Sequence, residues 1–364
     1  MSLVFETSRN AAARTDAQMA AIMADPGFGV HFTDHMAQIS WSKDDGWHDA
    51  AIKPYGPLSL DPSAAVLHYA QEIFEGLKAH RHADGSIWLF RPEKNAERLQ
   101  KSADRLMLPR LATDDFLEAV RQLVATDARW VPEPSGEQSL YIRPFMIASE
   151  SFLGVRAAEG VDFYVIASPV GPYFGPNGIK GVDIWVTDAW ARAGIGGTGA
   201  AKCGGNYAAS LIAQYEGYDH GCTQVMFIEP SGKDRVEELG GMNIFFISAD
   251  DRLVTPELTG TLLPGITRDS LIEVARSMGH RVTERKVALD EWRSGALNGA
   301  ITESFACGTA AVITPVGHVK GDVDDYTIAD GQPGKVTMAL RDTLTGIQRG
   351  TIADTHGWMT KLYG

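Results

Sequence analysis

Apolar residues follow two different periods along this chain. Short apolar or alternating runs bounded by turn residues are typical of strands, and they occur at residues 29–36, 37–41, 140–147, 162–168, 182–187, 223–228, 243–248 and 252–254. Apolar residues at helical spacing predict helices that begin at Pro92 and Thr113, and further helices at residues 206–216, 267–278 and 289–296. Because strands and helices alternate without a strict repeat, we expect two α+β domains.

Turn residues indicate where some of these elements meet. Asp84-Gly85 is a favoured tight-turn dipeptide, and it separates the strand-like runs 76–82 and 86–90, which predicts a β-hairpin. Pro92 is expected in the first turn of the next helix, where a missing N–H costs nothing. Thr113 is expected to cap the helix after that.

A segment rich in glycine and proline divides the chain. Residues 171–181 contain Pro172, Pro176 and four glycines, a composition typical of a loop. We therefore expect an N-terminal domain at residues 1–170, an interdomain linker at 171–181 and a C-terminal domain at 182–364. The first thirty residues show no strong periodicity and are expected to wrap the surface.

The composition excludes several classes of protein. The 364 residues carry a formal net charge of −13 and are 44% hydrophobic, so a globular protein is expected. No block of Lys and Arg is present, which argues against a nucleic-acid partner. A few well-placed arginines can still bind a small anion inside a negatively charged protein.

Cysteine usage and hydropathy indicate a reducing compartment. Cys203, Cys222 and Cys307 are odd in number and form no CxxC pair, so neither disulfides nor a zinc site are expected. No signal peptide and no stretch long enough to span a membrane are apparent, and we expect a cytoplasmic protein. His31, Asp34 and His35 lack a further ligand at suitable spacing, so no metal is expected.

The first candidate for chemistry is Lys202, which lies among small residues just before the helix predicted at 206–216. A lysine that forms a Schiff base must lose its proton, and a partly desolvated setting lowers its pKa. A solvated lysine beside a glycine loop is the commoner case. A nucleotide-binding loop fits poorly, because a P-loop needs Gly-Lys-Ser/Thr and the glycines at 194–199 lie too far before the helix for a Rossmann fingerprint.

Three further motifs suggest a carboxylate and an anion site. Glu237-Glu238 precedes a glycine turn and an apolar strand, although a solvated acid at a strand end is the simpler interpretation. Residues 263–270 open a helix whose first N–H groups could bind phosphate, with Thr267 as cap; an ordinary capped helix is the alternative. Residues 306–311 form a small-residue turn that lets backbone amides approach an anion. A lysine, a carboxylate and an anion seat are together what pyridoxal phosphate needs.

These motifs, with several others in the same order, resemble the branched-chain amino-acid aminotransferases, which are fold type IV pyridoxal-phosphate enzymes. The resemblance extends from Phe28-Gly29 to at least Pro315 and is most specific at residues 32–36, 67–76, 141–144, 202–207, 238–245 and 264–268. It implies a smaller N-terminal α/β domain and a larger, barrel-like C-terminal domain that binds the cofactor. The implied reaction moves an amino group between L-leucine, L-isoleucine or L-valine and 2-oxoglutarate.

The resemblance also implies a role for each matching residue. Lys202 would hold the cofactor and shuttle the proton, and Glu238 would pair with the pyridine nitrogen. The other expected cofactor ligands are Tyr207 for the phenolic oxygen and, for the phosphate, Arg98, Ile266, Thr267 and Thr309. The expected substrate ligands are Tyr141, Ala310 and Ala311 for the carboxylate, Arg143 for the distal carboxylate of glutamate, and Phe28, Tyr69 and Tyr173 for the side-chain pocket. Leu153 and Val155 match a loop that reaches into a partner subunit, which implies a homodimer.

Two departures from relatives and three rival interpretations remain at this point. Gly241 stands where some relatives have threonine. Ala311 and Thr314 replace a CxxC, so no thiol switch is expected, and Cys307 is expected to be buried and inert.

The rivals are a D-amino-acid aminotransferase or aminodeoxychorismate lyase, a cofactor carrier without turnover, and a nucleotide-binding protein. The sequence does not rank leucine, isoleucine and valine, and it leaves open other keto acids, assembly beyond a dimer and the direction of flux.

Overall fold

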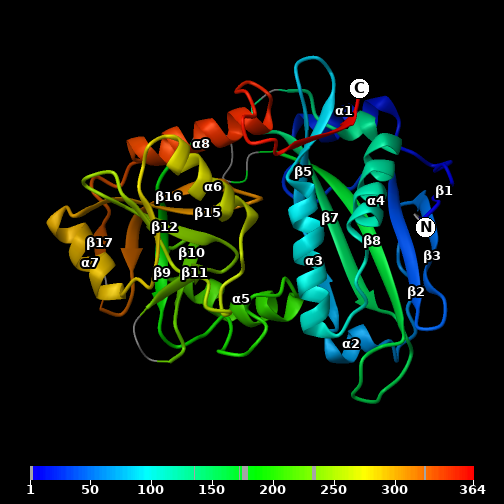
Figure 1. Cartoon of the computed structure of the whole chain (residues 1–364), viewed down its shortest axis with the longest axis horizontal. Helices are drawn as coiled ribbons and strands as arrows, with labels where there is room; N and C mark the ends of the chain where they lie inside the picture. The colour runs from blue at the N-terminus through cyan, green and yellow to red at the C-terminus, as the bar shows by residue number, and fades with distance from the viewer. Residues whose placement is uncertain (1–2, 135, 172, 174–178, 232–234, 324) are drawn as a thin grey trace. The chain divides into compact units, whose positions relative to one another are not determined.

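The computed structural model describes residues 3–134, 136–171, 173, 179–231, 235–323 and 325–364 (Figure 1). The chain divides into two compact units. The first unit comprises Met1–Gly175, Ala201–Gly204 and Ile347–Gly364, and the second comprises Pro176–Ala200 and Gly205–Gly346. Each unit is built around its own sheet and its own core.

The first unit contains a sheet of nine strands among the described residues, in the order β1-β3-β2-β8-β7-β5-β6-β18, with β4 paired to β7. Its strands are β1 (Glu6–Thr7), β2 (His35–Ser42), β3 (Gly46–Pro54), β4 (Glu72–Phe74), β5 (Leu77–Arg81), β6 (Ile87–Phe90), β7 (Ser139–Ala148), β8 (Gly160–Val170) and β18 (Met359–Tyr363). Apart from the parallel contact of β1 with β3, neighbouring strands are antiparallel. One face of such a sheet can pack on a core while the other remains accessible.

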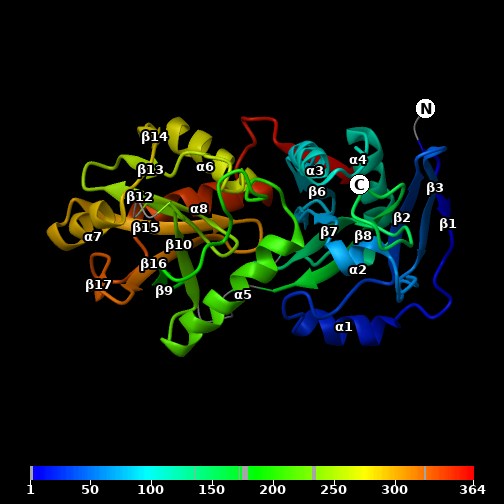
Figure 2. The ribbon, with the colours of Figure 1, turned by 90° about the horizontal axis from the view of Figure 1, so that it is seen from below.

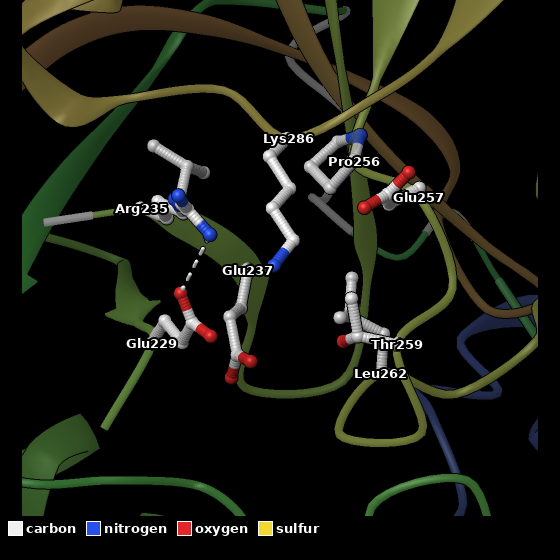
Figure 3. Close-up of a pocket in the computed structure, with 9 residues that line it drawn as sticks. Glu229, Arg235, Glu237, Pro256, Glu257, Thr259, Leu262 and Lys286 are labelled. Carbon is white, nitrogen blue, oxygen red and sulfur yellow. Dashed lines mark ion pairs between the residues drawn. The ribbon is translucent and has the colours of Figure 1, made fainter. Parts of the chain in front are cut away.

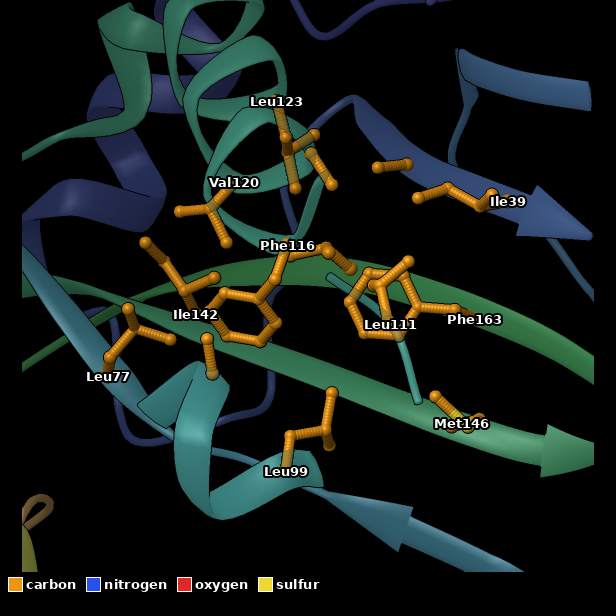
Figure 4. Packing of buried hydrophobic residues seen from close by; sticks show 14 of the residues in the cluster. Ile39, Leu77, Leu99, Leu111, Phe116, Val120, Leu123, Ile142, Met146 and Phe163 are labelled. Atoms are coloured by element: carbon orange, nitrogen blue, oxygen red, sulfur yellow. The ribbon is translucent and has the colours of Figure 1, made fainter. Parts of the chain in front are cut away.

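Two helices cover one face of this sheet. The helices of the unit are α1 (Asp16–Ala24), α2 (Ala65–Tyr69), α3 (Pro92–Leu106) and α4 (Thr113–Thr126), with a short 3₁₀ turn at Ala128–Trp130. Phe116, Val120 and Leu123 of α4 pack with Leu99 of α3 onto inward residues of the strands, including Phe163 (Figure 4). Burying side chains of this size contributes about 1.5–3 kcal/mol each, so this layer holds the unit together.

A buried histidine makes the first unit sensitive to acid. His80 on β5 is buried, and its Nε2 has no hydrogen-bond partner in the part of the chain that the structure describes. Burial, with Lys78 and Arg349 nearby, lowers its pKa to about 3. The pKa of His80 is lower in the folded state than in the unfolded state. The contribution of the neutral His80 to folding stability is therefore fully present above about pH 6.5 and is lost as the pH drops towards 3. We expect the free energy of unfolding to fall by about 2 kcal/mol between pH 6.5 and 5 from this group alone.

Thermal unfolding of the His80→Leu variant between pH 7.5 and 5 tests this expectation. The variant should show a shallower acid loss than the wild type, whereas His68→Leu, at an exposed site, should leave the slope unchanged. An equally steep loss in the His80→Leu protein would assign the acid sensitivity to other groups.

The second unit is built on a curled sheet. Among the described residues its order is β11-β10-β9-β16-β15-β12-β13-β14, with β17 paired to β16. Its strands are β9 (Val182–Thr187), β10 (Gln224–Ile228), β11 (Val236–Leu239), β12 (Asn243–Ser248), β13 (Leu253–Thr255), β14 (Val282–Glu284), β15 (Ile301–Gly308), β16 (Val312–Lys320) and β17 (Asp325–Thr327). The edge strand β11 turns directly into the interior strand β12, and a bridge joins Leu239 to Met242. This return curls the sheet, as the resemblance implied.

Helices surround this second sheet (Figure 2). They are α5 (Gly204–Asp219), α6 (Ile266–Ser277), α7 (Leu289–Asn298) and α8 (Lys335–Gln348). The fully buried Trp292 of α7 packs edge-on against Phe246 and Tyr326. The carboxylate of Glu303 accepts hydrogen bonds from the backbone N–H groups of Val336 and Thr337, so it satisfies the first turn of α8.

Most elements expected from periodicity are present. The ranges 182–187 and 243–248 coincide with β9 and β12, and the Asp84-Gly85 hairpin is confirmed as β5 and β6. The strand expected at 29–36 is wrong over most of its length, because β2 begins only at His35. The first thirty residues contain α1, whose Thr15–Gln18 capping box was overlooked.

Both expected threonine caps are wrong. Thr113 and Thr267 lie inside their helices, and the N-cap residues are Ala112 and Gly265, neither with a side-chain cap. A threonine one or two residues inside a helix has helical backbone angles, so it does not occupy the position from which a hydroxyl reaches the free N–H groups. The sequence located the two helix starts to within one residue but misassigned the residue that caps each helix.

The domains expected at 1–170 and 182–364 are continuous segments, whereas each compact unit is assembled from separate segments of the chain. Ala201–Gly204 and Ile347–Gly364 belong to the first unit, which is therefore the larger of the two. The expected linker at 171–181 falls partly on residues 172 and 174–178, which lie outside the described residues. No helix within the described part of the chain is long and apolar enough to cross a bilayer.

Candidate functional site

The exposed face of the first sheet carries a group of polar and aromatic side chains on β4 and β7. Phe74 stands opposite Phe145, and alternate residues of a strand share a face. Glu72, Phe74 and Arg143 therefore lie on the side away from the helices and are half-buried. The intervening residue Ile73 points into the core.

Three contacts fix the segment that carries Lys202 to the first unit. The Lys202 backbone N–H donates to Ser102 Oγ at 2.9 Å, and its carbonyl accepts from the Phe74 N–H at 2.9 Å. The N–H of Gly204 donates to the carboxylate of Glu72. A side chain at residue 204 would overlap this carboxylate, since a Cβ would lie 2.2 Å from Oε1. Lys202 is thus rigidly placed immediately before α5.

The amine of Lys202 is adapted for losing its proton. Burial, together with the positive charge of Arg98, lowers its pKa to about 8, although Glu75 acts in the opposite direction. Nζ lies 4.8 Å from the centroid of the Phe74 ring. A substantial fraction of the amine is therefore neutral near pH 8, which a nucleophilic or basic role requires.

Arg98 forms a fixed positive charge beside this lysine. Its Nε and Nη2 donate to the two carboxylate oxygens of Glu75 at 2.8 and 2.9 Å. Asn95 also donates to Glu75, and all three side chains are buried. A guanidinium held in two-point contact is suited to binding a phosphate or a carboxylate.

Tyr141 and Arg143 form an adjoining group. Arg143 Nη2 donates to the Tyr141 hydroxyl at 3.2 Å, and its guanidinium lies over the Phe74 ring at 4.7 Å from the centroid. Phe28 packs against both Tyr141 and Tyr173, with centroids 5.4 and 5.1 Å apart. The surface thus combines an apolar part with a cation.

Close packing around Tyr141 explains a neighbouring glycine. A Cβ on Gly76 would lie 2.1 Å from the Tyr141 hydroxyl oxygen. Tyr69 contacts the loop that carries Leu153 and Val155, since its hydroxyl donates to the carbonyl of Leu153 at 2.5 Å. Leu153 and Val155 are 67% and 92% exposed, so this loop presents apolar side chains to its surroundings.

The second unit contains a carboxylate with three donors. Glu238 on β11 is paired with the buried Arg192 at 2.5 Å. It also accepts from Asn243 Nδ2 at 2.9 Å and from the backbone N–H of Leu263 at 3.2 Å. These three contacts hold the Glu238 carboxylate in a fixed orientation.

The neighbouring Glu237 has different surroundings, because successive residues of β11 point to opposite faces. It accepts from the hydroxyl of Thr261 and lines an open pocket with Lys286 and other residues (Figure 3). Its Oε2 is buried and has no hydrogen-bond partner among the described residues, and burial raises its pKa. Glu237 and Glu238 therefore differ in their hydrogen-bond partners as well as in direction.

The N-terminus of α6 and the turn after β15 supply backbone donors. Gly265 is the N-cap of α6, and a Cβ there would lie 2.1 Å from Asn243 Oδ1. The first N–H groups of an α-helix have no carbonyl acceptor within the helix, so those of Ile266 and Thr267 are suited to binding an anion. Residues 309–311 connect β15 to β16, and Val312 has a positive φ of 60°, a strained conformation of the kind that accumulates at functional sites.

Gly241 and Cys307 both lie in the second unit. A Cβ on Gly241 would be in ordinary contact with Tyr207, at 3.6 Å from Cε1, so the glycine leaves space beside that ring. Cys307 is fully buried, and burial raises the pKa of its thiol to about 12. The expectation that Cys307 is buried is confirmed, and its raised pKa disfavours the reactive thiolate.

The expected residues fall into two groups according to unit. Phe28, Tyr69, Arg98, Tyr141, Arg143, Leu153, Val155, Tyr173 and Lys202 belong to the first unit, and Tyr207, Glu238, Ile266, Thr267, Thr309, Ala310 and Ala311 belong to the second. Sequence reasoning overlooked Glu72, Glu75, Ser102, Arg192 and Asn243, which contact members of these groups. Glu72 and Glu75 lie within a motif that was noticed, but no local signal identified Ser102 or Arg192.

Comparisons with known proteins identify the family to which this chain is similar. The family model described as amino-transferase class IV matches residues 72–319. The branched-chain-amino-acid aminotransferase of Mycolicibacterium smegmatis is 59% identical over 363 residues, covering 99% of this chain and 98% of that protein. The protein of the same name from Mycobacterium tuberculosis strain H37Rv is 56% identical over 364 residues, 99% of each chain.

Solved structures show the same similarity. The branched-chain amino acid aminotransferase of Escherichia coli has a TM-score of 0.74 at 27% identity, over 90% of this chain and 99% of that one. The T.th. branched-chain amino acid aminotransferase with pyridoxamine 5'-phosphate has a TM-score of 0.75 at 27% identity, over 90% of this chain and 99% of that one.

Proposed function

The chain belongs to the family of class IV aminotransferases, and from that premise we propose that it is a branched-chain L-amino-acid aminotransferase. The reaction is reversible transfer of the amino group between L-leucine, L-isoleucine or L-valine and 2-oxoglutarate. The observation that carries the proposal is the buried amine of Lys202, whose pKa is lowered to about 8. Lys202 belongs to the first unit, where the exposed face of the sheet carries the guanidinium of Arg143 next to aromatic side chains.

The residues present fit pyridoxal 5'-phosphate. When bound, this group supplies an aldehyde for amines and a ring that accepts electrons from the substrate's α-carbon. Lys202, with its readily neutralised amine, suits the covalent bond to the aldehyde. Glu238, whose carboxylate is held by Arg192, Asn243 and the Leu263 N–H, suits a protonated pyridine nitrogen.

The remaining cofactor contacts are proposed on the same basis. Arg98, the N–H groups of Ile266 and Thr267, and Thr309 would bind the phosphate, since they supply a fixed cation and donors at a helix start. Tyr207 would donate to the phenolic oxygen. These assignments follow the resemblance residue by residue, and each has the chemistry that the assigned atom requires.

Lys202 also has a role in moving the proton. With the cofactor bound, Nζ of Lys202, whose backbone is held by Ser102 and Phe74, would serve as the base for the proton on the substrate's α-carbon. The same amine, once protonated, would serve as the general acid. Holding the base in place removes the entropic cost of bringing it to that carbon.

Arg143 allows one pocket to accept both kinds of substrate. A branched side chain gains about 0.8 kcal/mol per buried CH₂ in an apolar pocket, which Phe28, Tyr69 and Tyr173 would line. The distal carboxylate of glutamate needs a cation instead, and Arg143 has a buried Nε without a hydrogen-bond partner among the described residues. Tyr141 and the turn at Ala310 and Ala311 would bind the α-carboxylate.

Assembly and location are proposed from exposure and from the thiols. The exposed Leu153 and Val155 support a homodimer in which this loop reaches a partner subunit. All three cysteines are free and buried, which fits the reducing cytoplasm. The proposed partners are small amino and keto acids, with neither nucleic acid nor membrane.

The visible absorption spectrum of the purified protein tests this function. After incubation with pyridoxal 5'-phosphate we expect a bound-cofactor band that L-leucine, added without keto acid, converts to that of the amino form. A band that D-alanine changes and L-leucine does not would favour a D-amino-acid enzyme. A band that no amino acid changes would indicate a carrier, and no band at all would overturn the assignment of Lys202.

A further inference from the structure

Glu72 is a carboxylate beside the proposed site to which neither the resemblance nor the proposed chemistry assigns a role. It lies two residues before Phe74 on β4, so both side chains share the accessible face of the sheet. Its Oε1 accepts from the N–H of Gly204, two residues after Lys202. Phe74 accepts the guanidinium of Arg143 over its ring. Glu72 thus connects the lysine segment to the strand that supports Arg143.

The charge of Arg143 acts on Glu72. The pKa of Glu72 is raised above its ordinary value, because burial outweighs the Gly204 amide and the positive charge of Arg143, which both lower it. No ion pair joins Arg143 to a carboxylate at 4 Å or less among the described residues, and its closest polar contact is the neutral Tyr141 hydroxyl. Glu72 is therefore the carboxylate that balances this guanidinium from a distance when no dicarboxylic substrate is present.

We propose that Glu72 is a specificity-determining residue that competes with the distal carboxylate of glutamate and 2-oxoglutarate for the charge of Arg143. The inference rests on the proposed function. A neutral branched side chain leaves the balance between Glu72 and Arg143 intact. A dicarboxylate brings a second negative charge, which Glu72 repels, so the affinity for glutamate is held below the value that Arg143 alone would give.

This competition has a use in a reversible enzyme with two substrates in one pocket. A buried cation without a counter-charge would bind dicarboxylates strongly and exclude branched substrates. A carboxylate nearby moderates that attraction without touching the apolar part of the pocket. The hydrogen bond to Gly204 keeps the carboxylate in place while substrates exchange.

The Glu72→Gln variant tests the proposal, because its amide oxygen can still accept from Gly204 while its charge is absent. We expect the KM for L-glutamate and for 2-oxoglutarate to fall by about fivefold, with the KM for L-leucine and both kcat values changed by less than about twofold. In the Arg143→Met background, the same substitution should leave the KM for glutamate unchanged. Glu72→Ala, which also loses the Gly204 contact, should lower kcat with both substrates.

Other results would overturn the proposal. A KM for glutamate that stays constant or rises in the Glu72→Gln protein means that Glu72 does not compete for Arg143. Equal changes for leucine and glutamate mean that Glu72 only braces the lysine segment. Wild-type protein that converts neither leucine nor glutamate would instead refute the proposed function, so the two failures are distinguishable.

Discussion

Replacing Lys202 with alanine is expected to abolish amino-group transfer, with kcat for L-leucine lowered by about 10⁴-fold or more. The lysine combines two tasks, the covalent attachment of the cofactor and the movement of the α-proton, and no other lysine replaces it in the first unit's fixed segment at Ala201–Gly204. Arginine at this position should be equally inactive, because a guanidinium does not lose its proton at usable pH. Stopped-flow absorbance after mixing with L-leucine measures the loss.

Folding should not account for that loss. Because burial lowers the folded pKa of Lys202 below its ordinary value, the charged amine costs stability at neutral pH; the cost sets in as pH falls from 10.5 towards 8 and is complete below 8. We therefore expect apo Lys202→Met to melt at a higher temperature than the apo wild type. The control Lys94→Ala removes a half-exposed lysine paired with Glu97 and should keep full activity. Leucine turnover above about 1% of wild type in Lys202→Ala would contradict the assignment.

Glu238→Gln is expected to lower kcat by about 10²- to 10³-fold, because a neutral amide cannot hold a proton on the pyridine nitrogen electrostatically. The adjacent Glu237 is the matched control. It points to the opposite face, towards the open pocket of Figure 3, and burial favours its neutral form. Glu237→Gln should therefore change kcat by less than about threefold.

The comparison of these two variants has a readout besides turnover. Titration of the apoprotein with pyridoxal 5'-phosphate, followed by quenching of tryptophan fluorescence, should show weaker binding for Glu238→Gln and unchanged binding for Glu237→Gln. Similar losses in both variants would mean that the pair acts as one coupled acid. A larger loss in Glu237→Gln would reverse the assignment of the two glutamates.

Much of the fold was predictable because its signals are local. Alternation along 140–147 predicted β7, and the same alternation places Tyr141 and Arg143 on the face opposite Ile142. The Asp84-Gly85 turn predicted the β5–β6 hairpin. The caps assigned to Thr113 and Thr267 were wrong, because a cap depends on the backbone angles of the residue before the helix, which composition does not determine.

The sequence by itself determined the chemical inventory of this protein and the face on which each strand residue lies. The tertiary structure decided which groups are buried, which are paired and which backbone supports them. Glu237 and Glu238 are indistinguishable by type, and only Glu238 meets Arg192, from a segment more than forty residues earlier. Likewise, the segment Ala201–Gly204 belongs to the first unit because it is hydrogen-bonded to Ser102, Phe74 and Glu72. Periodicity reports on neighbours a few residues apart, whereas desolvation and pairing depend on residues that only folding brings into contact.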